Sequence, residues 1–187
     1  MNEKRWEEKY TIKTVEDIPE PAKFLQHNAA ALTGGRALDI AMGAGQNSVF
    51  LAQCGYDVTG VDRSATAVGL ARDLAHKRGV SLTAVEADVL SYEIRQEAYD
   101  AIINFYFLER SLIPKIKAGL KKNGLVFFET YTLEQERFGG PHTRDFLLKP
   151  NELLAAFLDL FIIFYHERVE ETPRGSKALA SLIGQKV

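Results

Sequence analysis

The sequence predicts an α/β protein with a doubly wound, mostly parallel sheet of seven strands, helices on both faces and a C-terminal antiparallel hairpin. Two observations lead to this prediction: apolar runs alternate with helix-like segments along most of the chain, and the last two runs have no helix between them. Such alternation is typical of parallel sheets that helices cover on both faces. A parallel crossover needs about a dozen residues or more, so the last two runs should pair in antiparallel fashion.

The apolar segments of the chain define the expected strands. The segments RALDIA and YDAIINFYF are apolar over most of their length, as in strands buried within a sheet. The full set of expected strands spans residues 36–41, 56–62, 80–88, 99–107, 125–132, 160–169 and 178–187. The carboxyl ends of parallel strands share one edge of the sheet, and ligands bind at that edge in folds of this class.

Capping and stop residues locate the helices between these strands. Ser64 is a good N-cap for the amphipathic segment that follows it, and Gly79 is a good stop. Pro21 can occupy the first turn of an earlier helix, which the pair Gly34-Gly35 closes. Further helices are expected at residues 45–55, 65–79, 110–124 and 150–158.

Length and composition restrict the class of protein. A chain of 187 residues with 46% hydrophobic and 26% charged residues suits one globular domain. We expect a single domain over residues 1–187, with residues 1–33 as an N-terminal helical cap or lid. The net charge of −2 and the pI of about 6.1 reveal no basic excess, so no nucleic-acid partner is expected.

The same inspection predicts the compartment and the metal content. No apolar run is long enough to span a bilayer, and the opening residues MNEKRWEEKY lack the apolar core of a secretion signal. A single cysteine, Cys54, excludes an internal disulfide. We therefore expect a cytoplasmic protein without a membrane partner. The four histidines lack metal-ligand spacing, so no metal site is expected.

A glycine-rich turn joins the first strand to the next helix. Gly43 and Gly45 carry no side chain, so a ligand can approach the backbone and the free N–H groups of the helix start. A phosphate-binding P-loop needs Lys and then Ser or Thr after its second glycine, but Gln46-Asn47 follow here, which excludes it. The dinucleotide pattern G-x-G-x-x-G is incomplete because Ser48 takes the third position.

Three carboxylates at the ends of successive strands indicate what the turn holds. Asp39, just before the turn, would repel a pyrophosphate and attract a cationic group. Asp62, at the next strand end, is placed for the hydroxyls of a ribose. Asp88, at the third, could accept a hydrogen bond from the amine of a base. S-adenosylmethionine combines a cation, a ribose and an aminated base.

The segments LDIAMGAG, GVDRS, EADVL and YDAIINFYF resemble the successive motifs of class I S-adenosylmethionine-dependent methyltransferases. The resemblance covers roughly residues 36–187, and ALDIAMGAGQNSVFLAQCGYDVTGVDRS is similar to small bacterial methyltransferases of the tellurite-resistance group. It implies a Rossmann-like methyltransferase fold and S-adenosylmethionine as cofactor. The cofactor contacts that it implies come from Asp39, Ala41, Gly43, Gly45, Asn47, Asp62, Arg63, Asp88, Val89 and Asn104.

The chain departs from the family pattern at several positions. Ala41 replaces the first glycine of D-x-G-x-G-x-G, Met42 stands where cysteine or serine is common, and Gln46 stands where arginine is common. No N/D-P-P-aromatic motif follows the fourth strand, which argues against methylation of the amino groups of adenine or glutamine.

The resemblance also implies where the methyl acceptor binds. Tyr106, Glu129 and Tyr131 flank the expected methyl position, where they either line the acceptor pocket or pack in the core. Trp6 and Tyr10 would share one helix face and either pack or form a lid over the substrate. The remaining candidates lie in the long polar loop after the fifth strand: Arg144 as a substrate contact and His142, besides Glu129, as a general base for an oxygen acceptor.

These observations predict methyl transfer to a small molecule, either a thiol or a chalcogen oxyanion such as tellurite, by a monomer or homodimer. A soft anion of that kind would need no general base. One alternative is a non-catalytic module that binds S-adenosylmethionine. The other is a nicotinamide-dependent oxidoreductase, which the missing third glycine, Asp39 and the absence of room for a catalytic domain disfavour.

Overall fold

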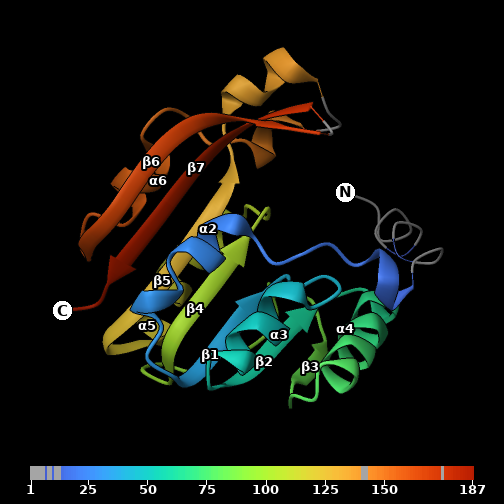
Figure 1. Ribbon diagram of the computed structural model, residues 1–187. Helices are drawn as coiled ribbons and strands as arrows, with labels where there is room; N and C mark the ends of the chain where they lie inside the picture. The colour runs from blue at the N-terminus through green and yellow to red at the C-terminus, as the bar shows by residue number, and fades with distance from the viewer. Residues whose placement is uncertain (1–6, 8–9, 11–13, 140–142, 174) are drawn as a thin grey trace.

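A computed structural model describes residues 7, 10, 14–139, 143–173 and 175–187. Within them the chain forms a sheet of seven strands in the order β3-β2-β1-β4-β5-β7-β6 (Figure 1). The strands are β1 (Gly35–Ile40), β2 (Tyr56–Asp62), β3 (Thr83–Glu86), β4 (Tyr99–Phe105), β5 (Leu120–Tyr131), β6 (Phe161–Thr172) and β7 (Gly175–Gln185). Strands β1 to β5 pair in parallel, whereas β7 runs antiparallel to both β5 and β6. The predicted fold class and terminal hairpin are therefore confirmed.

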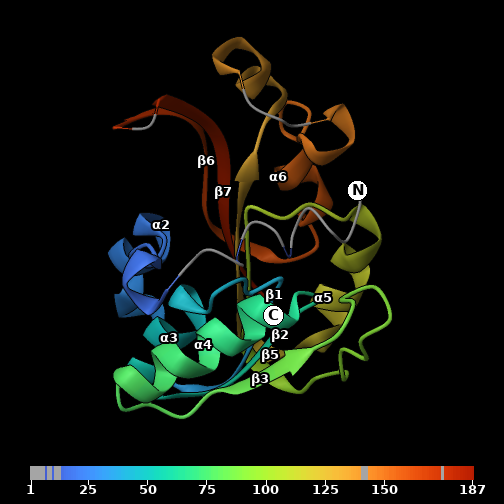
Figure 2. The same cartoon turned by 90° about the vertical axis from the view of Figure 1, so that its right-hand side faces the viewer.

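Helices cover both faces of this sheet. Figure 2 views the sheet nearly edge-on, with α2 and α3 on one side and α5 and α6 on the other. The α-helices are α2 (Lys23–His27), α3 (Gln46–Gln53), α4 (Ala65–Lys77), α5 (Ile113–Gly119) and α6 (Glu152–Ala156). Short 3₁₀ turns are η1 (Val15–Asp17), η2 (Ala29–Ala31), η3 (Arg110–Leu112), η4 (Leu133–Phe138) and η5 (Arg144–Phe146).

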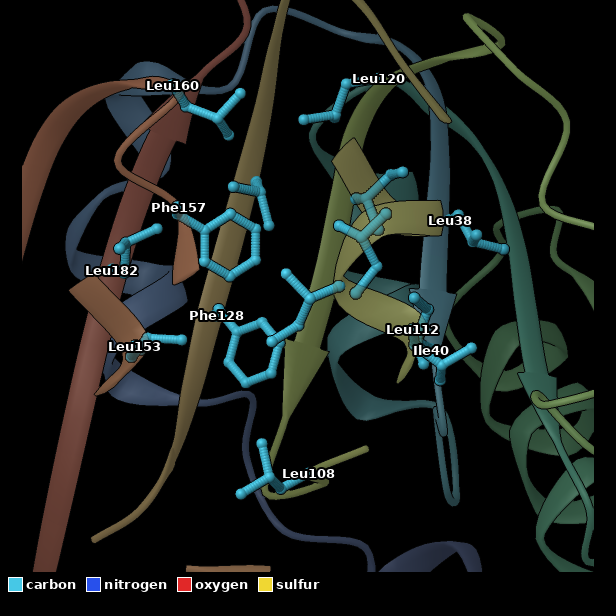
Figure 3. Packing of buried hydrophobic residues seen from close by; sticks show 14 of the residues in the cluster. Leu38, Ile40, Leu108, Leu112, Leu120, Phe128, Leu153, Phe157, Leu160 and Leu182 are labelled. Atoms are coloured by element: carbon cyan, nitrogen blue, oxygen red, sulfur yellow. The ribbon is translucent and has the colours of Figure 1, made fainter. Parts of the chain in front are cut away.

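The hydrophobic core has a layer on each side of the sheet. Because successive side chains of a strand point to opposite faces, Phe127 and Phe128 of β5 enter different layers. Phe128 packs with Phe157 and with the α5 side of the sheet (Figure 3). Phe127 packs with Phe24 of α2, at 6.3 Å between ring centroids. The two layers pack the sheet between its helices and leave its carboxyl edge to carry the site.

Several predicted boundaries are wrong, and tertiary pairing explains the largest error. The helix expected at 110–124 ends at Gly119, and Leu120 instead opens β5 opposite Tyr99. Leu120 is fully buried there, so burial in the sheet outweighs the helix propensity of the lysines that follow. A side chain at Gly119 would lie 2.7 Å from the Ile94 side chain, which explains the glycine at this crossing.

Other elements are shorter or longer than expected. The strand expected at 80–88 covers only Thr83–Glu86, and the helix expected at 150–158 covers only Glu152–Ala156. The terminal strands, by contrast, extend through most of the predicted turn at 170–177, because β6 continues to Thr172 and β7 begins at Gly175.

Candidate active site

The glycine turn lies at the carboxyl end of β1 and has a left-handed backbone at three positions. Gly43 has φ of +56° and Gly45 of +81°, which glycine adopts without a steric penalty. Ala41, in place of the usual first glycine, has φ of +55°. For a residue with a Cβ atom, this conformation costs roughly 1–2 kcal/mol. Ala41 therefore holds a left-handed backbone that a glycine at this position would adopt without that cost.

Close packing beneath the turn explains two glycines. A Cβ atom at Gly45 would lie 2.6 Å from the Cβ of Ala71, so this glycine lets α3 approach α4. A Cβ atom at Gly60 of β2 would lie 2.2 Å from the Met42 sulfur and 2.9 Å from the Ser48 hydroxyl. Met42 thus fills the space that Gly60 leaves free, and both residues fix the floor of the turn.

Asp39 lies under the turn, where its side chain is 1% exposed. The Ser48 hydroxyl donates to its Oδ2 at 2.6 Å. Burial raises the pKa of Asp39 to about 7, and the nearby Asp62 carboxylate acts in the same direction, while the Ser48 hydrogen bond opposes the rise. A ligand cation placed near Asp39 would favour its ionised form.

Asp62 and Asp88 lie at the same edge of the sheet as Asp39, as predicted from the strand ends. Asp62 Oδ2 accepts from the Gly43 N–H at 2.8 Å, and its Oδ1 accepts from the Ser64 N–H at 3.0 Å. It therefore joins the glycine turn to the start of α4, where Ser64 is the predicted N-cap. Asp88 Oδ1 accepts from the Leu90 N–H at 2.9 Å.

Tyr10 lies directly over the glycine turn. Its hydroxyl oxygen is 2.7 Å from the position that a Gly43 Cβ would take. Burial, and to a lesser extent Asp62, raise the pKa of Tyr10 to about 12. Part of the expected N-terminal cap thus touches the predicted cofactor loop, whereas Trp6 lies outside the described residues.

The other predicted cofactor contacts differ in their exposure. Asn47 is buried, and its Oδ1 accepts from the Ala22 N–H at 2.8 Å, at the start of α2. Asn104 is buried and donates from Nδ2 to the Phe107 carbonyl at 2.7 Å. Val89 is also buried, while Arg63 is exposed. Their cofactor roles stay predictions.

Glu129 is the centre of a polar network at the carboxyl ends of β4 and β5. Its side chain is 2% exposed, and its Oε2 accepts from the Ser181 hydroxyl at 2.6 Å and from Arg168 at 3.0 Å. Its Oε1 accepts from the Tyr106 hydroxyl at 3.1 Å. Three donors therefore engage the carboxylate that the sequence offered as a general base.

Tyr106 and Tyr131 form an aromatic pair over this network, with ring centroids 5.5 Å apart. Tyr106 has φ of +57° and remains 38% exposed. Burial and the Glu129 carboxylate raise the pKa of Tyr106 above its usual range, so its phenol stays protonated and donates. The ammonium of Lys177 lies 5.0 Å from the Tyr106 ring centroid, within the range of a cation–π contact.

Sequence reasoning missed Arg168, Lys177 and Ser181. They come from the terminal hairpin, whose register with β5 could not be read from the sequence. One feature of the sequence predicts a residue such as Arg168: Glu129 lies within an apolar strand, and a buried carboxylate needs a cationic partner. Arg144 of the long loop is exposed and pairs with Glu136, while His142 lies outside the described residues.

A family model supplies the comparison that decides the family. The model described as "Tellurite resistance protein TehB" matches residues 2–178. The chain belongs to the TehB family.

Within the described residues, no helix is long and apolar enough to cross a membrane, and no cluster of metal-binding side chains occurs.

The curated relatives include methyltransferases of two names. The chain is 29% identical over 174 residues to a ubiquinone biosynthesis O-methyltransferase of Bordetella avium, covering 81% of this chain and 72% of that one. It is 27% identical over 142 residues to a probable S-adenosylmethionine-dependent methyltransferase TehB of Haemophilus influenzae, covering 73% of this chain. The chain spans 49% of the length of that second relative.

Solved structures share the fold. TehB from Haemophilus influenzae matches with a TM-score of 0.72 at 22% identity, covering 87% of this chain and 61% of that one. A methyltransferase from Methanosarcina mazei matches with a TM-score of 0.71 at 20% identity, covering 90% and 99% of the two chains. These structures show the fold. The family model and the curated relatives identify the chain as an S-adenosylmethionine-dependent methyltransferase of the TehB family, with S-adenosylmethionine as its cofactor.

The residues at the sheet edge fit this cofactor. Gly43 carries no side chain, the nearest group to its missing Cβ is the Tyr10 hydroxyl at the end of a flexible side chain, and Asp62 places a carboxylate beside the turn. When bound, S-adenosylmethionine supplies an electrophilic methyl group on a sulfonium.

Proposed function

We propose that the enzyme methylates a small anionic acceptor that binds beside Tyr106 and Tyr131. The observation that carries this proposal is the Lys177 ammonium, which lies against the Tyr106 ring. The two tyrosines supply apolar faces, and Lys177 supplies a positive charge. A thiolate or a chalcogen oxyanion such as tellurite, the classes expected from the sequence, would be attracted to this charge.

The network around Glu129 supports an acceptor that needs no general base. Ser181, Arg168 and Tyr106 all donate to its carboxylate and hold it in place, and its side chain is only 2% exposed, so Glu129 offers an acceptor little surface. A thiolate or an oxyanion is already ionised, so it can attack the methyl group without proton transfer. Glu129 then serves to fix the position of the Tyr106 hydroxyl.

Alignment of the two reactants accounts for much of the rate in such a reaction. Holding a nucleophile in line with a reactive carbon contributes roughly 7–11 kcal/mol when the geometry is right. The Tyr106–Tyr131 pair would orient the acceptor, and Asp39 and Asp62 would hold the cofactor. Excluding water from the contact would keep the nucleophile unhydrated and reactive.

A screen of acceptors tests the proposal. The purified protein, with S-adenosylmethionine, is offered thiols, selenite, tellurite, small carboxylates and neutral phenols, and S-adenosylhomocysteine is measured. We expect turnover with anionic acceptors. Cofactor binding without turnover on any acceptor would favour a non-catalytic module, and turnover confined to neutral phenols would contradict the anionic class. The family assignment argues against a nicotinamide-dependent activity.

A matched pair of lysine variants tests the role of Lys177. A hydrogen bond to a charged group contributes about 1.5–3 kcal/mol, so Lys177→Gln should raise KM for an anionic acceptor by roughly tenfold or more. The exposed Lys122, near the start of β5 at the opposite edge of the sheet, provides the control variant Lys122→Gln. An equal KM in the two variants would remove Lys177 from acceptor binding.

The remaining expectations form part of this proposal. We propose a cytoplasmic location, which the single cysteine supports because disulfides are rare there. The acidic net charge of −2 supports the absence of a nucleic-acid partner.

A further inference from the structure

The ammonium of Lys177 lies over an aromatic ring although a carboxylate stands across from it. Lys177 of β7 is directly opposite Glu170 of β6 in the terminal hairpin, and opposed residues share a face of the sheet. Glu170 pairs instead with Arg168 at 3.2 Å and with Lys23 at 3.8 Å. The Lys177 ammonium is found 5.0 Å from the Tyr106 ring centroid. Its position therefore needs a cause other than the nearest carboxylate.

The β7 backbone around Lys177 extends beyond its ladder with β5. That ladder ends where Tyr131 lies opposite Leu179. One further bond continues it, from the Thr132 N–H to the Ala178 carbonyl at 3.0 Å. The N–H of Ala178 is left for another partner, and Ala178 is only 1% exposed. Because a buried N–H group without a partner is costly, a side chain has to supply what the strand does not.

The side chain of Gln135, in η4, supplies this partner. Its Oε1 accepts from the Ala178 N–H at 2.8 Å, and its Nε2 donates to the Ser176 carbonyl at 3.3 Å. Nε2 also donates to the Gly139 carbonyl at 3.1 Å, just after η4. Gln135 is itself 6% exposed. Its amide thus takes the place of a strand beside β7 and binds the backbone on both sides of Lys177.

Few side chains could replace Gln135 in this position. The Ala178 N–H needs an acceptor, whereas the carbonyls of Ser176 and Gly139 need donors, so one side chain has to provide both. A glutamine amide has one acceptor oxygen and two N–H donors, which matches these three groups. A glutamate carboxylate would set an oxygen against the two carbonyls. Methionine, of similar size, has no donor and only a weakly accepting sulfur.

We propose that Gln135 is a positioning residue of the acceptor site, because it holds the β7 backbone so that the Lys177 ammonium lies over the Tyr106 ring. This role rests on the proposed function, in which Lys177 attracts an anionic acceptor. The other side of the contact is fixed separately: the Tyr106 hydroxyl donates to Glu129, and its ring packs on Tyr131. A lysine has a flexible four-carbon stem, so where its ammonium lies depends on the backbone that carries it.

Two methionine substitutions in matched positions test this role by kinetics. Gln135→Met removes the amide beside Lys177. Gln185→Met, at the other end of β7, removes a bond of the same kind, from Gln185 Nε2 to the Asn123 carbonyl at 3.1 Å. Gln135→Met should raise KM for an anionic acceptor by up to the roughly tenfold expected of Lys177→Gln, and Gln185→Met should not. Partial unfolding lowers the apparent kcat but not KM, so lost stability alone cannot imitate this result.

A double variant separates positioning of the charge from general damage to the site. In the Lys177→Gln background, Gln135→Met should cause no further rise in KM, because the charge that it positions is already absent. A KM that rises in this background by the same factor as in the native chain would overturn the proposal.

NMR of lysine-labelled protein tests the placement of Lys177 without any acceptor. The Tyr106 ring current shifts the side-chain resonances of Lys177, which the spectrum of Lys177→Gln identifies by their absence. In Gln135→Met they should move toward those of a solvent-exposed lysine, and in Gln185→Met they should stay. Unmoved resonances in Gln135→Met would overturn the positioning role. Moved resonances together with an unchanged KM in Lys177→Gln would support the placement by Gln135 and contradict the proposed acceptor site instead.

Discussion

Replacing Gly45 with alanine should cost more folding stability than the same change at Gly43, two residues earlier in the same turn. Both glycines have positive φ, so each replacement costs roughly 1–2 kcal/mol in backbone strain. At Gly45 the new Cβ atom would also lie 2.6 Å from the Ala71 Cβ and 3.0 Å from its Cα, forcing α3 away from α4. Overpacking of this kind adds roughly 1–3 kcal/mol.

At Gly43 the close neighbour is a different kind of group. The new Cβ atom would meet the hydroxyl of Tyr10 at 2.7 Å, and this end of a flexible side chain can move aside. Gly43→Ala should therefore lose only the strain contribution. It should nevertheless weaken S-adenosylmethionine binding, because the added methyl group occupies the space between the turn and Tyr10, where the cofactor is expected to approach the backbone.

Urea denaturation and thermal melting of both variants measure the difference. A chain of this size loses about 2–4 °C of Tm for each kcal/mol, so Gly45→Ala should melt roughly 2–12 °C below Gly43→Ala. Cofactor titration by calorimetry supplies the second readout. Equal melting temperatures in the two variants would refute the argument that Gly45 is required by the contact of α3 with α4.

Two further predictions concern buried carboxylates. Arg168→Met should destabilise the fold by about 3 kcal/mol, since it leaves Glu129 buried without its cation, and adding Glu129→Gln should recover most of the loss in a double-mutant cycle. Additive losses would contradict this coupling. For Asp39, the pKa of about 7 in the folded chain lies above the ordinary value of 3.8, so the folded chain keeps a proton that the unfolded chain has released. The contribution of this proton to the free energy of unfolding is complete below pH 3.8 and is lost as pH rises toward 7. Urea denaturation over this pH range should therefore give a free energy of unfolding that falls for the native chain, and Asp39→Asn should lack this fall.

The sheet was predictable because its signals are local. Apolar runs of strand length, the Ser64 cap and the Gly79 stop each depend on residues a few positions apart, and the structure confirms them. The helix expected from Pro21 to the pair Gly34-Gly35 is wrong in its bounds, because α2 covers only Lys23–His27 and Gly35 opens β1. The absence of a helix between the last two runs was enough to predict the antiparallel hairpin. The error at Leu120 arose where its burial opposite Tyr99, a contact between distant residues, decided the local structure.

The residues of the site also differ in whether a local pattern predicts their position. Asp39, Asp62 and Asp88 could be placed together because each ends a strand of one parallel sheet. Arg168 and Lys177 could not, because their position depends on the register of β7 against β5, which no short pattern encodes.

The packing of Met42 against Gly60 has a consequence for how relatives of this chain diverge. The thioether occupies the volume that any side chain at position 60 would need, with only 2.2 Å between the sulfur and a Cβ atom there. The two positions should thus covary: homologues that keep methionine at 42 must keep glycine at 60, while alanine at 60 requires a smaller residue at 42 and a shift of the Ser48 hydroxyl, which lies 2.9 Å from that Cβ position. Evolution can exchange this pair only in that order, the smaller residue arriving at 42 first.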